Sequence, residues 1–248
     1  MSEWAVYPAI DLRAGRVVRL AQGDPARETW YSDDPSSVAV RWRDAGAEWV
    51  HVINLDGALD QAGALNAGAL EAIIAVGVKV QFGGGMRDLQ AMRRAAELGV
   101  RRVIIGTAAV EDPALVEAAL AELGAERVAV GIDARDGAVR THGWRREEGV
   151  SAVELAQWWK RHGAKWVIYT DVGRDGMGSG INLAATVELA RDSGMSVIAA
   201  GGAASLDDVR QVRAAGLAGV VLGRALYEDK VDLAKALAVG EEKARDAG

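Results

Sequence analysis

The sequence contains no cysteine in its 248 residues. Disulfide bonds, thiolate nucleophiles and cysteine-based metal sites are therefore excluded. The sequence also has no apolar run that approaches the roughly 20 residues of a membrane-spanning helix. Glu3 and Asp11 interrupt the apolar stretch near the N-terminus, so no signal peptide is expected. These absences predict a cytoplasmic protein with no membrane partner.

The charge and the histidines argue against two further classes of ligand. The formal net charge is −6, which argues against a surface for nucleic acid. His142 and His162 have no histidine or carboxylate at the spacing of metal ligands, so no metal site is expected. Any anionic ligand has to be held locally, by backbone dipoles and a few arginines.

An internal repeat is the most informative feature that is present. Residues 80–112 recur as residues 197–229 with no gap. Each copy consists of an apolar run that ends in Gly-Gly, a helical stretch, and a second apolar run that ends in glycine. Two copies of one unit indicate a ligand with two similar ends.

The repeat extends over the whole chain. Asp11 and Asp133 lie in two matching Ile-Asp-x-Arg segments. The chain is therefore interpreted as two related halves, approximately 1–122 and 123–248. No linker and no shift in composition separates them, so residues 1–248 are expected to form a single domain.

Short β-branched runs alternate with stretches rich in Ala, Leu, Glu and Arg. Eight such units match the (β/α)₈ or TIM barrel, and the alternative is an open doubly wound sheet. The repeat favours the barrel, because two four-unit halves close by a two-fold rotation. Strands are expected at about 4–10, 48–54, 78–82, 102–105, 127–132, 165–170, 196–200 and 219–222. Helices are expected at about 35–45, 66–75, 88–98, 113–123, 151–162, 183–193, 205–215 and 232–245.

Two aspartates are the first candidates for catalysis. In such barrels the active site lies at the C-terminal ends of the strands. Asp11 follows the first apolar run and Asp133 follows the fifth, and these two strands face each other across the barrel axis. The two carboxylates would then point into one mouth, an arrangement suited to acid–base chemistry. A lone aspartate more often caps a loop or pairs with a neighbour such as Arg13 or Arg135, but the symmetric pair favours catalysis.

Glycine turns mark two candidate phosphate sites. Glycine lets the backbone approach an anion, and the start of the following helix offers free N–H groups. The loops after strands 7 and 8 are the usual phosphate site of barrels, and the copy after strands 3 and 4 would form a second site on the opposite rim. The alternative is that these glycines only make tight turns. The first set is Gly84, Gly85, Gly106 and Thr107, and the second is Gly201, Gly202, Gly223 and Arg224.

Four further side chains lie in expected strands or in the loops that follow them. Thr170 is a candidate for hydrogen bonding to a substrate hydroxyl. Asp175, before Gly176 in a glycine-rich loop, is either a second candidate acid or a turn residue. His51 is expected to point into the barrel below the mouth, as a ligand-binding or a core histidine. Trp144, in the long loop after strand 5, is a candidate for stacking on a heterocyclic ligand.

The motifs together resemble one family, the ProFAR isomerases of histidine biosynthesis. ProFAR is 1-(5-phosphoribosyl)-5-((5-phosphoribosylamino)methylideneamino)imidazole-4-carboxamide. The resemblance runs in order along the chain, through PAIDL at 8–12, GRVVRL at 15–20, HVINLD at 51–56, GGGMR at 83–87, GTA at 106–108, GW at 143–144, TD at 170–171, RDG at 174–176, AGG at 200–202 and GRALY at 223–227.

The resemblance implies a duplicated half-barrel, a small-molecule substrate with two phosphates, and no cofactor. The implied reaction is an Amadori rearrangement of an aminoaldose to an aminoketose. It places Asp11 as the general base and Asp133 as the general acid. Thr170 is expected to be a third catalytic residue, and Arg19 is expected to bind the substrate. Asp175 remains the alternative acid. A monomer is expected.

Three alternatives remain. The related cyclase of the same pathway usually has a Cys-Leu-Asp start and a lysine in the first loop, where this chain has Pro-Ala-Ile-Asp and Arg19. A dual-substrate isomerase that also acts on phosphoribosylanthranilate typically has an arginine two residues before the tryptophan, where this chain has His142. A non-catalytic phosphate-sugar-binding barrel would be favoured by loss of either aspartate, and both are present.

Overall fold

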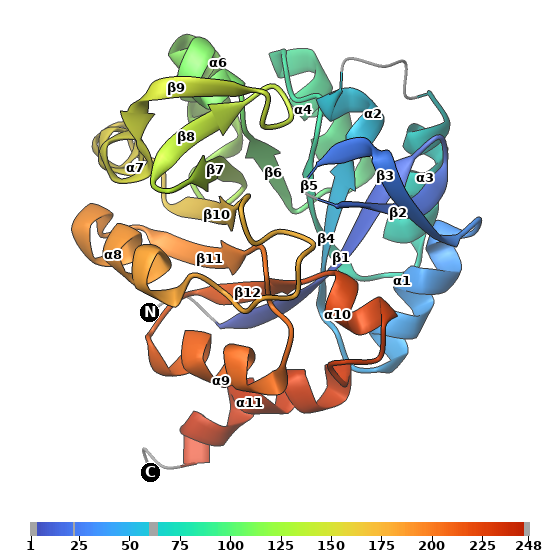
Figure 1. Ribbon diagram of the computed structural model, residues 1–248. Helices are drawn as coiled ribbons and strands as arrows, with labels where there is room; N and C mark the ends of the chain where they lie inside the picture. The colour runs from blue at the N-terminus through green and yellow to red at the C-terminus, as the bar shows by residue number, and fades with distance from the viewer. Residues whose placement is uncertain (1–3, 22, 60–63, 246–248) are drawn as a thin grey trace.

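Eight parallel strands close into a barrel in the described part of the chain. The computed structural model describes residues 4–21, 23–59 and 64–245. The strand order is β10-β11-β12-β1-β4-β5-β6-β7, and pairing of β10 with β7 closes the ring (Figure 1). The predicted (β/α)₈ barrel is confirmed. Its strands are β1 (Ala5–Arg13), β4 (Trp49–Asn54), β5 (Lys79–Gly83), β6 (Arg102–Ile105), β7 (Val128–Arg135), β10 (Trp166–Asp171), β11 (Ser196–Ala200) and β12 (Gly219–Leu222).

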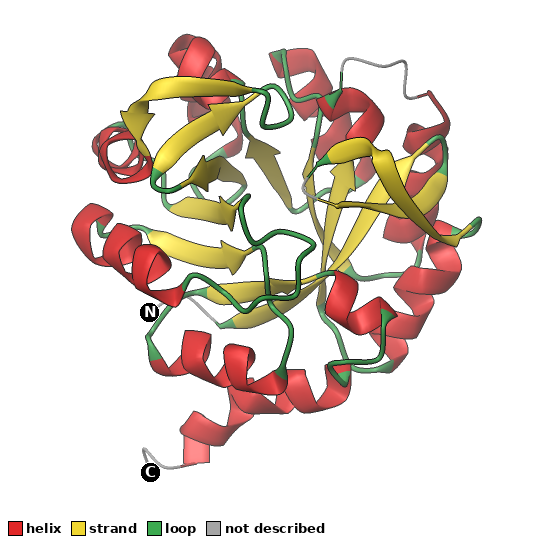
Figure 2. Cartoon of the chain, in the orientation of Figure 1, coloured by secondary structure: helices red, strands yellow, loops and turns green. Residues whose placement is uncertain are grey.

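Helices cover the outside of the barrel (Figure 2). Every helix predicted from the sequence is present, with bounds that differ by at most a few residues. One of them begins with a capping box, in which the side chains of Ser205 and Asp208 bond to each other's backbone. No described helix is long and apolar enough to cross a bilayer. The helices are α1 (Pro35–Asp44), α3 (Ala64–Ala75), α4 (Leu89–Leu98), α6 (Pro113–Leu123), α7 (Ala152–Arg161), α8 (Leu183–Ser193), α9 (Leu206–Ala214) and α11 (Leu233–Arg245).

The sequence pattern does not predict two antiparallel hairpins that stand at the mouth of the barrel. Their outer strands are partly or fully exposed to solvent, and so lack the apolar alternation that identifies a strand. Three single-turn helices are also missed, because one turn leaves no periodic pattern. The hairpins are β2 (Arg16–Ala21) with β3 (Asp24–Ser32) and β8 (Ala138–Thr141) with β9 (Arg146–Ser151), and the helices are α2 (Leu55–Ala58), α5 (Ala108–Glu111) and α10 (Arg224–Tyr227).

The hairpins correct the expected ends of the first and fifth barrel strands. Asp11 and Asp133 lie within β1 and β7 and do not follow them. Each strand continues because its end pairs with the first strand of a hairpin, with Asp11 opposite Val18 and Asp133 opposite Arg140. Both aspartates are therefore held on hydrogen-bonded backbone at the mouth.

The apolar core has two parts. The larger part lies between the barrel and its helices, and the smaller part fills the interior of the barrel. Tyr7, Ile168 and Ile198 belong to the interior part. Because these side chains pack the barrel from below, a ligand fits at the end where the strands terminate.

Candidate active site

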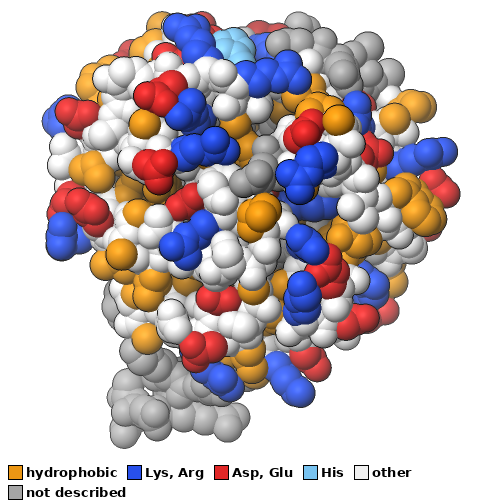
Figure 3. Space-filling view, viewed as in Figure 1, with side chains coloured by type: hydrophobic (Ala, Val, Ile, Leu, Met, Phe, Trp, Pro, Cys, Tyr) orange, Lys and Arg blue, Asp and Glu red, His pale blue; other side chains and the backbone are white. Residues whose placement is uncertain are grey.

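A cavity of about 260 Å³ lies at the C-terminal ends of the strands. All eight barrel strands contribute residues to its wall. On the face of the molecule in Figure 3, Lys and Arg side chains are interspersed with Asp and Glu. The described part of this face therefore has no broad positive surface. The cations that line the cavity are Arg19, Arg87, Arg224 and Lys230.

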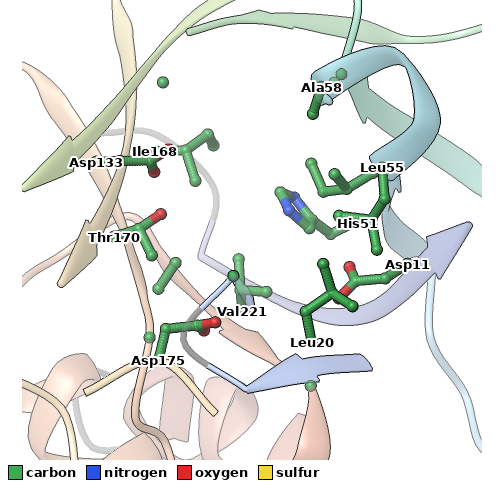
Figure 4. Close-up of a pocket in the computed structure, with 18 of the residues that line it drawn as sticks. Asp11, Leu20, His51, Leu55, Ala58, Asp133, Ile168, Thr170, Asp175 and Val221 are labelled. Carbon is green, nitrogen blue, oxygen red and sulfur yellow. The ribbon is translucent and has the colours of Figure 1, made fainter. Parts of the chain in front are cut away.

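The two predicted catalytic aspartates line this cavity from opposite sides (Figure 4). Asp11 comes from β1 and is buried, with 6% of its surface exposed. Asp133 comes from β7, four positions round the barrel. The arrangement expected from the repeat, two carboxylates facing one another across a single mouth, is present.

Arg19 joins Asp11 to Asp175. Its Nη1 donates to Oδ2 of Asp11 at 2.7 Å, and its Nη2 donates to Oδ1 of Asp175. Arg19 comes from β2, so the first hairpin supplies the cation that lies between these two acids. Burial raises the pKa of Asp175, and the charge of Arg19 opposes that rise. Asp175 points into the cavity (Figure 4), so it is more than a turn residue.

Asp133 has neutral partners. The indole Nε1 of Trp144 donates to its Oδ2 at 2.8 Å, and the hydroxyl of Thr170, opposite it on β10, also donates to it. Burial raises the pKa of Asp133, and these two hydrogen bonds oppose that rise without cancelling it. The indole of Trp144 is thus hydrogen-bonded to Asp133, and its ring packs against Gly23. Its stacking on a ligand stays a prediction.

His51 lines the cavity and is also hydrogen-bonded below it. Only 7% of its surface is exposed, and its Nδ1 lies 2.9 Å from Nε2 of Gln81. Burial, followed by the positive charge of Arg19, lowers the pKa of His51 to about 3. The imidazole is therefore neutral near pH 7. It is buried and hydrogen-bonded as a core histidine would be, and its role in binding a ligand stays a prediction.

The two glycine sets line the same cavity. Gly84 and Gly201 have φ angles of 92° and 83°, in the region that favours glycine. A Cβ on Gly84 would lie 2.1 Å from the carbonyl oxygen of Asn54, and one on Gly201 would lie 2.7 Å from that of Asp171. The two close approaches are equivalent in the two copies of the repeat. The remaining members that line the cavity are Gly85, Gly106, Thr107, Gly202, Gly223 and Arg224.

The glycine-rich loop after β10 is connected to the second glycine set. Nη1 of Arg224 donates to the carbonyl oxygen of Gly176 at 2.6 Å, and its Nε donates to Glu228. Arg224 and Gly176 both line the cavity. The loop that holds Asp175 is thus fastened to the residues predicted to bind one phosphate.

Sequence reasoning missed Gln81 and Arg102. Gln81 is fully buried, and Arg102 has 4% of its surface exposed. The sequence contained a signal for both, because each is a polar residue in an apolar run. The equivalent position in the other copy of the repeat is Ile198 for Gln81 and Gly219 for Arg102.

Comparison with known proteins shows the family of the chain. Residues 5–232 match the family described as Histidine biosynthesis protein. A protein of Rhizorhabdus wittichii is 52% identical over 239 residues, which cover 94% of this chain and 97% of the relative. A protein of Sphingopyxis alaskensis is 49% identical over 244 residues, covering 97% of this chain and 99% of the relative.

A third relative, from Heliobacterium modesticaldum, is 46% identical over 241 residues and covers 96% of this chain and 98% of its own length. All three are named 1-(5-phosphoribosyl)-5-((5-phosphoribosylamino)methylideneamino) imidazole-4-carboxamide isomerase. The similarity spans the barrel, both hairpins and the cavity. The chain belongs to the histidine biosynthesis protein family.

Proposed function

We propose that the chain is an aldose–ketose isomerase that converts ProFAR to its aminoketose isomer in L-histidine biosynthesis. The observation that supports this most is the pair Asp11 and Asp133, which face each other across one cavity (Figure 4). An Amadori rearrangement needs an acid and a base on either side of a sugar. It needs no external oxidant or reductant, because C1′ is reduced as C2′ is oxidised.

Asp133 is suited to be the acid. Burial raises the pKa of its carboxyl, and the groups that bond to it, Thr170 and Trp144, are neutral. Asp175 also has a raised pKa, but the guanidinium of Arg19 bonds to it directly and favours its charged form. Protonation of the ribose ring oxygen by Asp133 then opens the ring to an iminium ion.

Asp11 is suited to be the base. Its Oδ2 accepts a hydrogen bond from the guanidinium of Arg19, and this bond to a cation holds the carboxyl group in place at the cavity wall. Removal of the C2′ proton by Asp11 gives an enolamine, which becomes the ketose. The proton that leaves C2′ goes to Asp11, and the proton that opens the ring comes from Asp133. When the enolamine becomes the ketose, C1′ gains a proton and the hydroxyl on C2′ loses one. Over the whole reaction the substrate therefore gains two protons and loses two, and Asp11 and Asp133 return to their starting states.

The two glycine sets are proposed to bind the two phosphates of the substrate. Gly84 and Gly201 bring backbone to the cavity wall in the two halves, and Arg224 adds a cation beside the second set. Phosphates held at both ends would stretch the substrate across the two aspartates. Binding energy from the ends of the molecule then positions the reacting carbons.

The dual-substrate alternative depends on position 142. The arginine expected there would have to reach the cavity. His142 instead bonds through Nε2 to Oε1 of Glu111 at 2.9 Å, and its backbone N–H donates to Thr107. Nothing in this arrangement favours a second substrate. Cytoplasmic location, a monomeric state, and the absence of a cofactor and of a nucleic-acid partner stay predictions from the sequence.

Steady-state assays with ProFAR and with phosphoribosylanthranilate, in buffer containing a chelator, test the proposal. We expect turnover of ProFAR alone. Turnover of both substrates would support the dual-substrate alternative. Turnover of neither by folded protein would contradict the proposed function and lead back to the cyclase and binding-protein alternatives.

A further inference from the structure

A hydrogen-bonded chain of three side chains runs below the cavity. His51, Gln81 and Arg102 stand on the neighbouring strands β4, β5 and β6, and the register pairs His51 with Gln81 and Gln81 with Arg102. All three are buried. Polar groups removed from water are costly unless each one is bonded, so the direction of every bond in this chain is constrained.

Arg102 fixes the direction of the hydrogen bonds at the end of the chain opposite His51. Its Cζ lies 3.8 Å from the ring centroid of Trp166 and 5.0 Å from that of Trp49, so the guanidinium makes cation–π contacts with two indoles. Its Nη1 donates to Oε1 of Gln81 at 3.1 Å. Arginine has donors only, so the oxygen of the Gln81 amide has to face Arg102.

The amide orientation then fixes the tautomer of His51. With its oxygen on Arg102, Gln81 presents its NH₂ group to Nδ1 of His51. That nitrogen has to be the acceptor, because the amide nitrogen only donates. The neutral imidazole of His51 therefore has its proton on Nε2.

The imidazole itself projects into the cavity (Figure 4). No hydrogen bond from Nε2 to another of the described residues is present. His51 stands on the strand beside Asp11, one inward-facing position deeper, since Ala9 is its register partner and Asp11 is that of Ile53. A donor at this place lies next to the proposed base.

The other half of the barrel shows that the fold does not need these polar groups. The equivalents of His51, Gln81 and Arg102 in the repeat are Ile168, Ile198 and Gly219. They have the same pairing between neighbouring strands, β10, β11 and β12. The same three paired positions are thus filled by residues without polar side chains in one half of the barrel and by three polar side chains in the other.

We propose that Arg102 and Gln81 are positioning residues that hold His51 as its Nε2–H tautomer, so that Nε2–H donates to the oxygen on C2′ of the substrate. That oxygen gains enol character when Asp11 removes the C2′ proton, and a neutral donor stabilises it without competing for the proton. The hydrogen bond to the substrate oxygen rests on the proposed function, whereas the tautomer is inferred from contacts within the protein alone.

Nitrogen-15 NMR of histidine-labelled protein tests the tautomer without any substrate. The chain has three histidines, and His51 is assigned by the signal lost in His51→Gln. We expect the Nε2–H tautomer in the wild type and loss of this single tautomer in Gln81→Met, which keeps the length of the side chain and removes the amide. An Nδ1–H tautomer in the wild type, or an unchanged tautomer in Gln81→Met, would overturn the proposal.

Kinetics with ProFAR test the consequence. We expect Gln81→Met to lower kcat about tenfold, the scale of one hydrogen bond, with a smaller change in KM. His51→Gln, whose amide can donate from a similar place, should keep more activity than His51→Leu. In a His51→Leu background Gln81→Met should cause no further loss. Full additivity of the two losses would overturn the proposal.

The matched control is Ile198→Met, at the equivalent place in the other half. It places the same new side chain at the equivalent position, and we expect kcat to stay within about twofold of the wild type. An equal loss of kcat in Ile198→Met and Gln81→Met would overturn the positioning role, since packing alone would explain both. If the wild type does not turn over ProFAR, the proposed function fails while the NMR result still decides the tautomer.

Discussion

The indole nitrogen of Trp144 lies 2.8 Å from Oδ2 of Asp133. The same ring packs on Gly23, where an added Cβ would lie 2.6 Å from Cε3 of Trp144. One side chain therefore connects the β8–β9 hairpin to the β2–β3 hairpin and bonds to the proposed acid. Trp144 has to leave this carboxylate, or share it, when a substrate reaches Asp133.

Replacement of Trp144 by phenylalanine should shift the pH profile of the enzyme. The indole bond lowers the pKa of Asp133, so its loss raises that pKa further. The acid has to be protonated to act, and kcat/KM reports the free enzyme. The descending limb of kcat/KM against pH should therefore move to higher pH. A limb that moves to lower pH, or stays in place, would contradict the assignment of Asp133 as the acid.

Asp11→Asn should abolish turnover while leaving ligand binding largely intact. The amide has nearly the same shape as the carboxylate but cannot accept the C2′ proton, and loss of a general base typically costs about 10²–10⁴-fold in rate. Single-turnover assays give the rate, and calorimetric titration with the ketose product gives the affinity. If affinity falls as far as the rate, Asp11 is a binding residue and not a base.

Asp175→Asn should keep more activity than Asp133→Asn. Asp175 is bonded to Arg19, whereas Asp133 has only neutral partners. The residual kcat of the two variants, measured with the same preparation of ProFAR, decides which group is the acid. The reverse order would assign that role to Asp175.

Arg19→Gln should destabilise the protein most at neutral and alkaline pH. The change leaves Asp11 and Asp175 buried without their cation, and loss of one partner of a buried ion pair costs about 3 kcal/mol. It also removes the charge that lowers the pKa of Asp175. A carboxyl with a raised pKa binds its proton more tightly in the folded state, so the lost stability returns as pH falls through that pKa.

Thermal unfolding of Arg19→Gln at several pH values measures this effect. The control is Arg93→Gln, which breaks the exposed pair with Glu122, and its Tm should change little at any pH. A loss of Tm in Arg19→Gln that is the same at pH 5 and pH 8 would show that Asp175 does not titrate as described.

Gly201→Ala should weaken substrate binding more than Gly216→Ala. Both glycines have positive φ, 83° and 74°, so both variants carry backbone strain of about 1–2 kcal/mol. Only at Gly201 does the new Cβ meet backbone, 2.7 Å from the carbonyl oxygen of Asp171, whereas Gly216 has nothing within 4 Å. We expect a higher KM for ProFAR in Gly201→Ala alone. An equal KM in the two variants would contradict a phosphate role for this turn.

Much of the site follows from local patterns in the sequence. Asp11, Asp133 and the two glycine sets are identified because each stands where an apolar run ends. The repeat supports them, since Asp11 matches Asp133 and the first glycine set matches the second. His51 and Thr170 are found from the alternation of inward and outward residues along a strand. The hairpin strands β3 and β9 could not be found this way, since they pair with a neighbour in space and have no apolar face.

The sequence by itself determined the barrel, the end of it that binds ligand, and the carboxylates that face each other there. Apolar periodicity and the repeat are properties of neighbouring residues, and they are visible without coordinates. Only the tertiary structure decided what each side chain bonds to. Arg19 meets Asp175 across 156 positions of the chain, and Gln81 directs the tautomer of His51 only because two strands lie side by side. Charge, burial and hydrogen-bond direction depend on such distant neighbours, which no local pattern specifies.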